Sequence, residues 1–295
     1  MSQLPVSVLI VNYNTADYVV ACIQSLLTLD SQALEILVVD NASKDDSVAK
    51  LKATFGDRIT LIQSPENLGF GRANNLASQH AKGEYFLLLN PDTQLTDPDT
   101  LPKMLATLNQ SDDVGIVGPL IHEPRKNSFV KPKYQYPSHG KLNTKRQFSH
   151  LPGRIAWLLG ACLLMRSSLY KQLGGFDPDF FLYGEDVDIC MRVRKAGFRI
   201  LQCETATIMH AAGASELKEV PYDTRLRKER GFFLFCKKHY SPLAVRWIAF
   251  ASIMASSIKT FVFRVTGKQG TTLARASALR QAASEVFSRD FFGKS

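Results

Sequence analysis

Residues 6–14 have the sequence VSVLIVNYN, a run dominated by β-branched residues that ends in three polar or aromatic residues. A run of this kind, without polar alternation, predicts a strand that is buried on both faces. Thr15 or Asp17 can start the helix that follows toward Leu29. The sequence therefore opens on the strand-then-helix unit from which parallel sheets are built.

Short apolar segments continue to alternate with helical patterns along the chain. Strands that alternate with helices predict βαβ units, a mostly parallel sheet and the α/β class. The further predicted strands are Glu35–Asp40, Ile59–Ile62, Tyr85–Leu89, Val114–Val117, Ala156–Met165 and Arg199–Met209; the further predicted helices are Ser47–Phe55, Ala73–Ala81, Pro98–Gln110 and Val187–Ala196.

Charge is distributed unevenly along the chain. Residues 1–115 carry 7 Lys/Arg and 14 Asp/Glu, residues 116–240 carry 21 and 11, and residues 241–295 carry 8 and 2. A basic surface in the later part favours an anionic partner there, which can be nucleic acid, anionic lipid or a phosphorylated substrate. A solvated basic surface without a specific partner is the alternative.

Two later segments depart from the α/β pattern. Pro124–Arg146 holds seven Lys/Arg and three prolines, which predicts a long basic loop. Trp247–Ile258 is a stretch of 12 uncharged residues between Arg246 and Lys259. This stretch falls short of the roughly 20 residues that a spanning helix needs. We therefore expect an amphipathic helix that lies at a membrane surface or packs on protein.

The cysteines and the N-terminus indicate the compartment. The five cysteines are scattered and form no C-x-x-C pair, which favours buried thiols in a reducing cytosol. Met1–Pro5 lacks a basic segment before the first strand, so no cleaved secretory signal is expected.

Polar residues stand at the ends of three predicted strands. They are Asn12, Asp40 with Asn41, and Asn90 with Asp92. Ligands bind outside the carboxyl ends of the strands in an open α/β sheet. Each of these residues alone could simply form a turn, but three such ends together predict a polar pocket along one edge.

The segment Gly69–Asn74 resembles a dinucleotide fingerprint only in part. The third glycine of that motif is replaced by Asn74, and the segment does not follow the first strand, which argues against a nicotinamide dehydrogenase. Glycines at a helix start still suit the close approach of a phosphate group, with Arg72 as a donor. A glycine turn with a solvated arginine is the alternative.

Three carboxylates, Glu185, Asp186 and Asp188, follow the aromatic run Phe180–Tyr183. They could merely complement a helix dipole. Aromatic side chains next to these acids, however, predict a partly desolvated carboxylate with a raised pKa, which is what a general base requires. His210 follows an apolar strand, where either a structural role or metal ligation is open.

Five segments then occur in an order that is more specific than any one of them. They are residues 8–14 (VLIVNYN), 39–43 (VDNAS), 66–70 (ENLGF), 89–93 (LNPDT) and 184–188 (GEDVD). Over about residues 5–240 the chain resembles the family 2 glycosyltransferases, most closely the bacterial rhamnosyltransferase-type members. The resemblance implies a GT-A fold, in which a mostly parallel nucleotide-binding sheet is flanked by helices, here with a helical C-terminal appendage.

The resemblance also implies roles for individual residues. Asn90-Pro91-Asp92 stands in the place of the Asp-X-Asp metal motif, and Asn90 leaves one charge fewer there, which implies weaker metal affinity. The implied cofactor is Mg or Mn, bound by Asp92 and His210, and the implied catalytic base is Asp186. The residues implied to bind the nucleotide sugar are Asn12, Asp40, Arg72, Asn90 and Asp92. We assign acceptor binding to Trp157 and Glu185.

The predicted activity is inverting transfer of a sugar, with L-rhamnose favoured, from a nucleotide diphosphate to a cell-surface glycan or its lipid-linked precursor. Residues 1–240 form the predicted catalytic domain, with a nucleotide-sugar half (1–115) and an acceptor half (116–240). Residues 241–295 form a helical segment that binds membrane or makes a homo-oligomer.

The predicted location is cytoplasmic, at the inner face of an anionic membrane. The alternatives are another donor such as a uridine-diphosphate hexose, or a module that binds a nucleotide sugar without turnover. A nucleic-acid partner is disfavoured, since aromatic and basic residues are not interleaved.

Overall fold

The computed structural model describes residues 6–28, 34–138, 147–211, 221–266 and 271–291. Two expectations concern residues outside these ranges: the expectation about a secretory signal, which rests on Met1–Pro5, and the expectation of a loop at residues 139–146. The chain forms two compact units. The first comprises residues 1–135, 149–181 and 185–217, and the second comprises residues 136–148, 182–184 and 218–295.

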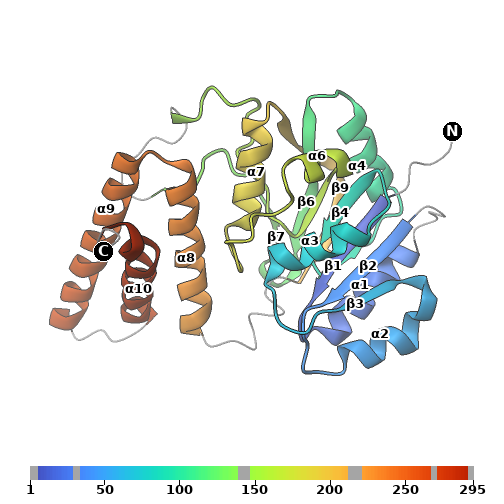
Figure 1. Ribbon diagram of the computed structural model, residues 1–295, viewed down its shortest axis with the longest axis horizontal. Coiled ribbons are helices and arrows are strands. Elements are labelled where there is room, and N and C mark those ends of the chain that lie inside the picture. Colours follow the sequence, from blue (N-terminus) through green and yellow to red (C-terminus); the bar gives the residue numbers. More distant parts are fainter. Residues whose placement is uncertain (1–5, 29–33, 139–146, 212–220, 267–270, 292–295) are drawn as a thin grey trace. The chain divides into compact units, whose positions relative to one another are not determined.

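A nine-stranded sheet organises the described part of the first unit (Figure 1). Its strand order is β3-β2-β1-β4-β8-β6-β9-β5, and β7 pairs with β6. The four strands β1 to β4 are parallel to one another, as is β9 to β6, whereas β8, β5 and β7 pair antiparallel. The bounds are β1 (Val6–Asn12), β2 (Leu34–Asp40), β3 (Thr60–Gln63), β4 (Tyr85–Leu89), β5 (Thr93–Leu95), β6 (Val114–Glu123), β7 (Ser128–Val130), β8 (Cys162–Arg166) and β9 (Arg199–His210).

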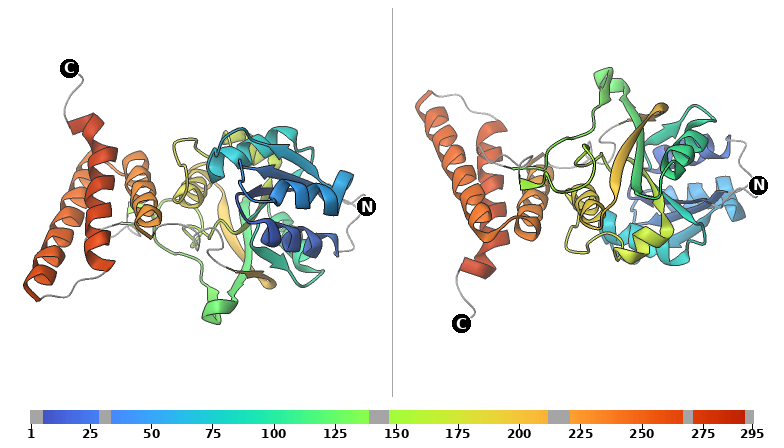
Figure 2. Two further views of the ribbon diagram at one scale, coloured as in Figure 1. Left: turned by 90° about the horizontal axis from the view of Figure 1, so that it is seen from below. Right: turned by 90° about the horizontal axis from the view of Figure 1, so that it is seen from above.

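Helices cover both faces of this sheet (Figure 2). On one face, α1, α2 and α4 pack against alternate residues of the strands, such as Val8, Ile10 and Leu87. On the other face, α3, α6 and α7 pack against the intervening residues, such as Leu9 and Phe86. The helices are α1 (Ala16–Leu27), α2 (Ser47–Phe55), α3 (Phe70–His80), α4 (Thr100–Asn109), α6 (Ser167–Gln172) and α7 (Glu185–Lys195), with single 3₁₀ turns η1 (Gly56–Arg58) and η2 (Pro124–Lys126).

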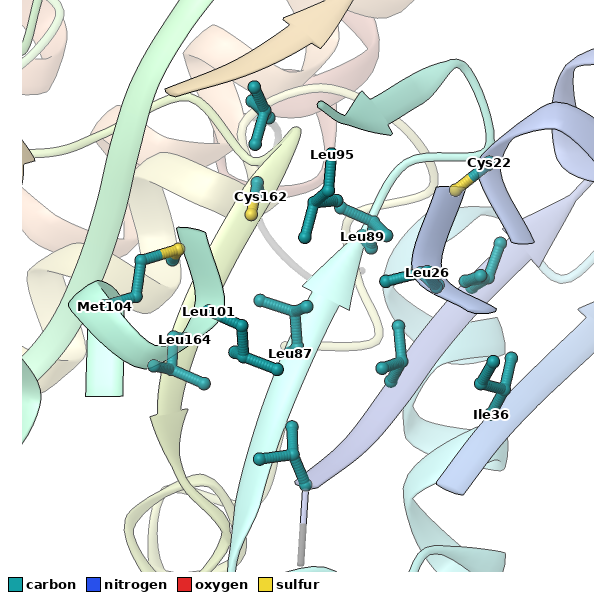
Figure 3. Close-up of a cluster of buried hydrophobic side chains, with 14 of the residues drawn as sticks. Cys22, Leu26, Ile36, Leu87, Leu89, Leu95, Leu101, Met104, Cys162 and Leu164 are labelled. Atoms are coloured by element: carbon teal, nitrogen blue, oxygen red, sulfur yellow. The ribbon is translucent and has the colours of Figure 1, made fainter. Parts of the chain in front are cut away.

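The strands have unbroken apolar sequences because helices cover both faces of the sheet. Successive strand residues point to opposite faces, so a strand covered on both sides needs apolar residues at every position. Figure 3 shows the first cluster, in which Cys22 and Leu26 of α1, Leu101 and Met104 of α4 and Leu87 of β4 meet. The predicted α/β fold with a mostly parallel sheet is therefore confirmed.

Three local expectations need correction. Ala156–Met165 was expected to be one strand, but β8 begins only at Cys162, because residues 156–157 instead exchange backbone hydrogen bonds with Lys133. The segment Pro124–Arg146 is not all loop, because Ser128–Val130 pairs with β6 as β7. The apolar C-terminal stretch is also longer than expected.

The second unit contains α8 (Pro221–His239), α9 (Pro242–Thr266) and α10 (Thr271–Phe291). Its aromatic cluster joins Tyr136, Phe148, Phe235 and Tyr240, whose ring centroids lie 5.2 to 6.0 Å apart. The Tyr240 hydroxyl donates to the carbonyl of Pro137 at 2.6 Å. This cluster ties the start of the unit to the end of α8.

By length and composition alone, one described helix could cross a membrane: Pro242–Val262 within α9. The expectation that this region is too short was therefore wrong, because the helix extends on both sides of Trp247–Ile258 through further apolar residues. A core helix of a soluble protein passes the same test. Length does not distinguish a spanning helix from one that lies on a surface.

Candidate active site

The ends of β1 and β2 form a closed set of polar contacts. The two strands are parallel and in register, so that Asn12 lies beside Asp40. Asn12 Nδ2 donates to Asp40 Oδ1 at 2.9 Å and to Ser43 Oγ at 3.1 Å, and the Ser43 amide donates to Asp40 Oδ2 at 3.1 Å. Thr15 Oγ1 donates to Asn12 Oδ1 at 2.7 Å. Asp40 is thus held buried and aimed at this edge by its own neighbours.

A second set of contacts fixes the loop before α3. Asn41 Nδ2 donates to Asn67 Oδ1 at 2.9 Å, and Asn41 Oδ1 accepts from the Leu68 amide at 2.8 Å. Asn67 Oδ1 also accepts from the Gly69 amide at 2.9 Å. The side chain of Asn41 therefore supplies hydrogen bonds to the loop at residues 67–69, which has no neighbouring strand to provide them.

The glycine at the start of α3 is explained by protein contact. Gly69 has φ of 80°, and a Cβ atom there would lie 2.2 Å from the carbonyl oxygen of Phe181. The Phe70 amide donates to that same carbonyl at 2.9 Å. Close approach by a phosphate was one interpretation of these glycines; instead, the segment that ends at Phe181 occupies this helix start.

Arg72 is exposed, and its Nε donates to the carbonyl of Pro178 at 2.8 Å. The guanidinium thus fastens the Asp177–Phe181 segment to α3. A role for Arg72 toward a nucleotide stays a prediction.

The segment Asn90–Thr93 forms a tight turn after β4. The carbonyl of Asn90 accepts from the Thr93 amide at 3.3 Å and from Thr93 Oγ1 at 2.6 Å. The antiparallel pairing of β5 with β9 sets Thr93 opposite His210, and the Ala211 amide donates to the Asp92 carbonyl at 2.9 Å. This pairing brings Asp92 and His210 together, with Oδ1 and Nε2 3.2 Å apart and both side chains 8% exposed.

The Asp92–His210 pair fits a divalent cation in part. A carboxylate oxygen and an imidazole nitrogen are suitable donors for Mn²⁺, and a carboxylate suits Mg²⁺. His210 Nδ1 is buried without a hydrogen-bond partner among the described residues, which is the sign of an incomplete polar site. No cluster of three or more such side chains occurs in the described ranges, so most ligands would come from a substrate and water.

Asp186 stands at the start of α7, where two backbone N–H groups hold its carboxylate. The Gly160 amide donates to Oδ2 at 3.2 Å and the Val187 amide to Oδ1 at 2.8 Å. The next residue, Ala161, accepts from the Asn90 amide at 2.9 Å. Two consecutive residues therefore connect Asp186 with the turn that carries Asp92.

Burial shifts the pKa values of two neighbouring carboxyl groups, those of Glu185 and Asp186. Burial raises the pKa of Asp186, as the aromatic flank predicted, while the amides of Gly160 and Val187 act in the opposite direction. Burial and the charge of Asp186 raise the pKa of Glu185 to about 8. Glu185 Oε2 is buried without a hydrogen-bond partner among the described residues. Glu185 therefore holds its proton at neutral pH, whereas the hydrogen bonds from the two amides favour the ionised form of Asp186.

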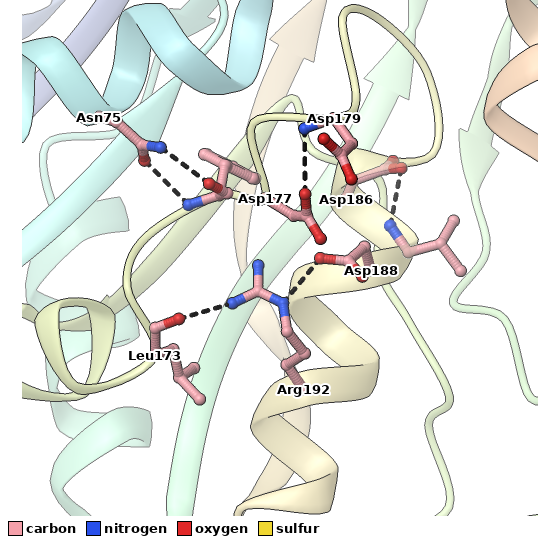
Figure 4. A network of polar contacts seen from close by, with 9 residues as sticks. Asn75, Leu173, Asp177, Asp179, Asp186, Asp188 and Arg192 are labelled. Atoms are coloured by element: carbon pink, nitrogen blue, oxygen red, sulfur yellow. Dashed lines mark hydrogen bonds and ion pairs between the residues drawn. The ribbon is translucent and has the colours of Figure 1, made fainter. Parts of the chain in front are cut away.

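Asp188 has a different task from its two acidic neighbours. It is 1% exposed and accepts from Arg192 Nε at 2.7 Å, four residues along α7 (Figure 4). Arg192 Nη1 donates to the carbonyl of Leu173 at 3.0 Å. The ion pair lies within α7, and the hydrogen bond to Leu173 ties the helix to the segment before it.

Asn75 of α3 secures the same segment from the other side (Figure 4). Its Oδ1 accepts from the Phe176 amide at 2.8 Å and from the Tyr170 hydroxyl at 2.6 Å, and its Nδ2 donates to the Phe176 carbonyl at 2.8 Å. The segment leading to α7 is thus clamped between α3 and α7.

Trp157 is half-buried, and its Nε1 donates to the carbonyl of Gln135 at 3.2 Å. Its backbone also pairs with Lys133. These contacts account for the position of the ring, and an acceptor role for it is not tested by them.

Several residues that build this site carry little or no signal in the sequence. Gly160 gave no signal, because its contribution is a backbone N–H group placed by tertiary structure. Asn75 lay in a helix without a visible partner. The spacing of four between Asp188 and Arg192 could have revealed their ion pair.

Comparisons with known proteins identify the family and the fold. The family model described as Glycosyl transferase family 2 matches residues 7–174. A curated relative is the N-acetylglucosaminyl-diphospho-decaprenol L-rhamnosyltransferase of Mycobacterium tuberculosis, which is 26% identical over 231 residues, covering 69% of this chain and 75% of the relative.

Solved structures share the fold at low identity. The mannosyltransferase PcManGT from Pyrobaculum calidifontis, in complex with GDP-Man and Mn²⁺, superposes with a TM-score of 0.60 at 19% identity, over 97% of this chain and 88% of that one. S. aureus TarS 1-349 in complex with UDP-GlcNAc gives a TM-score of 0.57 at 18% identity, over 96% and 82%. These neighbours support a GT-A-like architecture.

Proposed function

The chain belongs to glycosyl transferase family 2, and from this premise we propose that it transfers a sugar from a nucleoside diphosphate donor to a hydroxyl group of a cell-surface glycan or its lipid-linked precursor, with inversion at C1. The observation that carries the proposal is the buried, backbone-held carboxylate of Asp186, connected through residues 160–161 to the turn that bears Asp92.

The donor occupies the edge where β1, β2 and β4 end. Asp40 and Asn12 face the nucleobase, since the buried Asp40 carboxylate can accept base N–H groups. Arg72, Asn90 and Asp92 serve the phosphates. Ligand binding at the carboxyl ends of the strands follows the general rule for open α/β sheets.

Asp92 and His210 would hold Mg or Mn together with the diphosphate. When bound, the cation supplies charge neutralisation for the departing diphosphate. The relative scarcity of protein ligands agrees with a hard cation that keeps several waters. The solved structure of PcManGT is a complex with GDP-Man and Mn²⁺, which supports this choice.

Asp186 accepts the proton of the acceptor hydroxyl while the acceptor oxygen forms its bond to C1. The bond between C1 and the diphosphate oxygen breaks on the opposite face, and the nucleoside diphosphate leaves. One base is sufficient for this displacement, and a raised pKa brings Asp186 closer to the operating pH. Protonated Glu185, with Trp157, would contact the acceptor, because a carboxylic acid can donate to a sugar oxygen.

L-Rhamnose, carried by deoxythymidine diphosphate, is the favoured sugar, since the curated relative from Mycobacterium tuberculosis is an L-rhamnosyltransferase. Its name also supports a lipid-diphosphate acceptor, which agrees with an enzyme at the cytoplasmic face of the membrane. A uridine-diphosphate hexose is the second candidate, supported by the UDP-GlcNAc bound to TarS. Residues 1–240 form the proposed catalytic domain, and residues 241–295 attach it to membrane or to a second copy.

A donor screen tests the proposal. Purified protein is given dTDP-L-rhamnose, UDP-GlcNAc, UDP-glucose or GDP-mannose, a membrane lipid extract, and either Mn²⁺ or EDTA. Each donor carries a labelled sugar. We expect that only one donor releases its nucleoside diphosphate and transfers the labelled sugar to the lipid fraction. Donor binding without release would instead identify a non-catalytic module.

A further inference from the structure

Helix α9 carries a continuous exposed apolar stripe. Six large side chains at spacings of three and four residues are between 44% and 77% exposed. At about 100° per residue they fall within roughly 80° of arc and extend over about 27 Å of helix. The stripe consists of Leu243, Trp247, Phe250, Met254, Ile258 and Phe261.

The opposite face of α9 is covered by protein. Ile248, Ser252 and Ser256 are 0 to 5% exposed, and Ser256 Oγ donates to the carbonyl of Ala276 in α10 at 3.2 Å. Figures 1 and 2 show α9 alongside α10 within this unit. A helix that spans a bilayer on its own would present lipid-compatible surface all round. A helix covered on one side and apolar on the other is suited to lie in the plane of a surface.

Charge identifies the chemistry of that surface. Residues 242–266 contain no Asp or Glu, and residues 241–295 carry 8 Lys/Arg against 2 Asp/Glu. Arg246 is exposed next to Trp247. Two copies of this basic segment would repel each other, whereas anionic lipid headgroups attract it. Trp247 also suits the boundary between headgroups and acyl chains, because its ring is apolar and its indole N–H is polar.

We propose that the exposed stripe of α9 is a membrane-docking surface, inserted in the plane of an anionic leaflet with its basic residues at the headgroups. A lipid-linked acceptor would be presented at that same leaflet, and this purpose rests on the proposed function. Docking itself requires neither donor nor acceptor, so vesicle binding can fail while transfer succeeds, and the reverse.

The test is co-sedimentation of the full chain with vesicles of phosphatidylcholine alone or with 30% phosphatidylglycerol. We expect at least tenfold stronger partitioning into the anionic vesicles at low ionic strength, partial release by salt, and at least a tenfold loss of binding in the double variant Trp247→Ser and Phe250→Ser. The matched control, Phe129→Ser with Tyr134→Ser, removes two exposed rings from the first unit and should bind as the wild type does.

The proposal would be overturned if the wild-type protein does not bind anionic vesicles, or if the stripe variant still binds them as the wild type does. Sedimentation velocity adds a second reading. If the wild type is a dimer that the stripe variant dissociates, while vesicle binding is unchanged, the occupant of the stripe is a second copy and the lipid assignment is wrong.

Discussion

The environment of Asp186 and the outer face of α9 are opposites. At Asp186, charged and polar groups are buried; the carboxylates of Asp186 and Asp188 have protein partners, whereas Glu185 Oε2 has none among the described residues. On α9, large apolar groups are exposed to solvent. Buried polar groups and exposed apolar patches are the two arrangements that folding alone does not favour. We therefore propose a function for each: chemistry at the first and attachment at the second.

The largest expected effect comes from removing the metal. EDTA should abolish transfer, because the diphosphate would leave without charge neutralisation. Asp92→Ala should weaken both Mn²⁺ and donor binding, measured by calorimetry, and His210→Ala should do so more mildly. Vesicle binding should stay unchanged throughout. Full-rate transfer in chelator would mean that cationic side chains such as Arg72 carry the phosphate charge.

The next effect comes from Asp186→Asn, which removes the base but keeps an acceptor for the Gly160 amide. Turnover should fall by a factor of about 100 or more, as expected for loss of a general base, while donor affinity stays close to that of the wild type. Steady-state kinetics and donor titration measure the two quantities. Near-normal turnover would remove Asp186 from the mechanism.

Glu185 should make stability depend on pH. Its pKa is 4.5 ordinarily and about 8 in the folded chain, so the unfolded state ionises first and the wild type loses stability as pH rises from about 4.5 through 8. At pH 7 this cost is on the order of 3 kcal/mol. Glu185→Gln should match the wild type near pH 4 and exceed its free energy of unfolding at pH 8. Parallel pH profiles for the two proteins would contradict the buried, protonated glutamate.

Substitutions around Asp186 and on the outer face of α9 should also differ in their effect on the free energy of unfolding. Asn75→Ala leaves the Phe176 amide and carbonyl without their partner and should cost about 2 kcal/mol or more in urea unfolding. Tyr170→Phe removes one hydroxyl group, which donates to Asn75 Oδ1, and should cost about 1 kcal/mol. Phe250→Ser, on the exposed stripe, should stay within about 0.5 kcal/mol of the wild type. A large loss from Phe250→Ser would show that the stripe is part of a core.

Much of the first unit could be predicted from the sequence, because strand burial on both faces and turn residues are local signals. The strand ends at Asn12, Asp40 and Asn90 followed directly from that pattern. Ala156–Met165 was predicted wrongly, since its first residues are apolar for packing while their backbone pairs with Lys133.

The candidate site was predictable only as a set of side chains. Their roles toward each other depend on tertiary contacts that leave no local signal, such as the Gly160 amide at Asp186 and the Phe181 carbonyl at Gly69. The length of α9 was underestimated because charged residues bracket its most apolar part, although a helix tolerates them at its surface.

If one base at Asp186 directs a single displacement at C1, the anomeric configuration of the product must be inverted. The donor selected by the screen is converted with wild-type protein, and the new glycosidic linkage is assigned by NMR. We expect the configuration opposite to that of the donor. Retention of the donor's configuration would contradict it, because retention requires a second displacement or a front-side reaction that this arrangement of Asp186 does not provide.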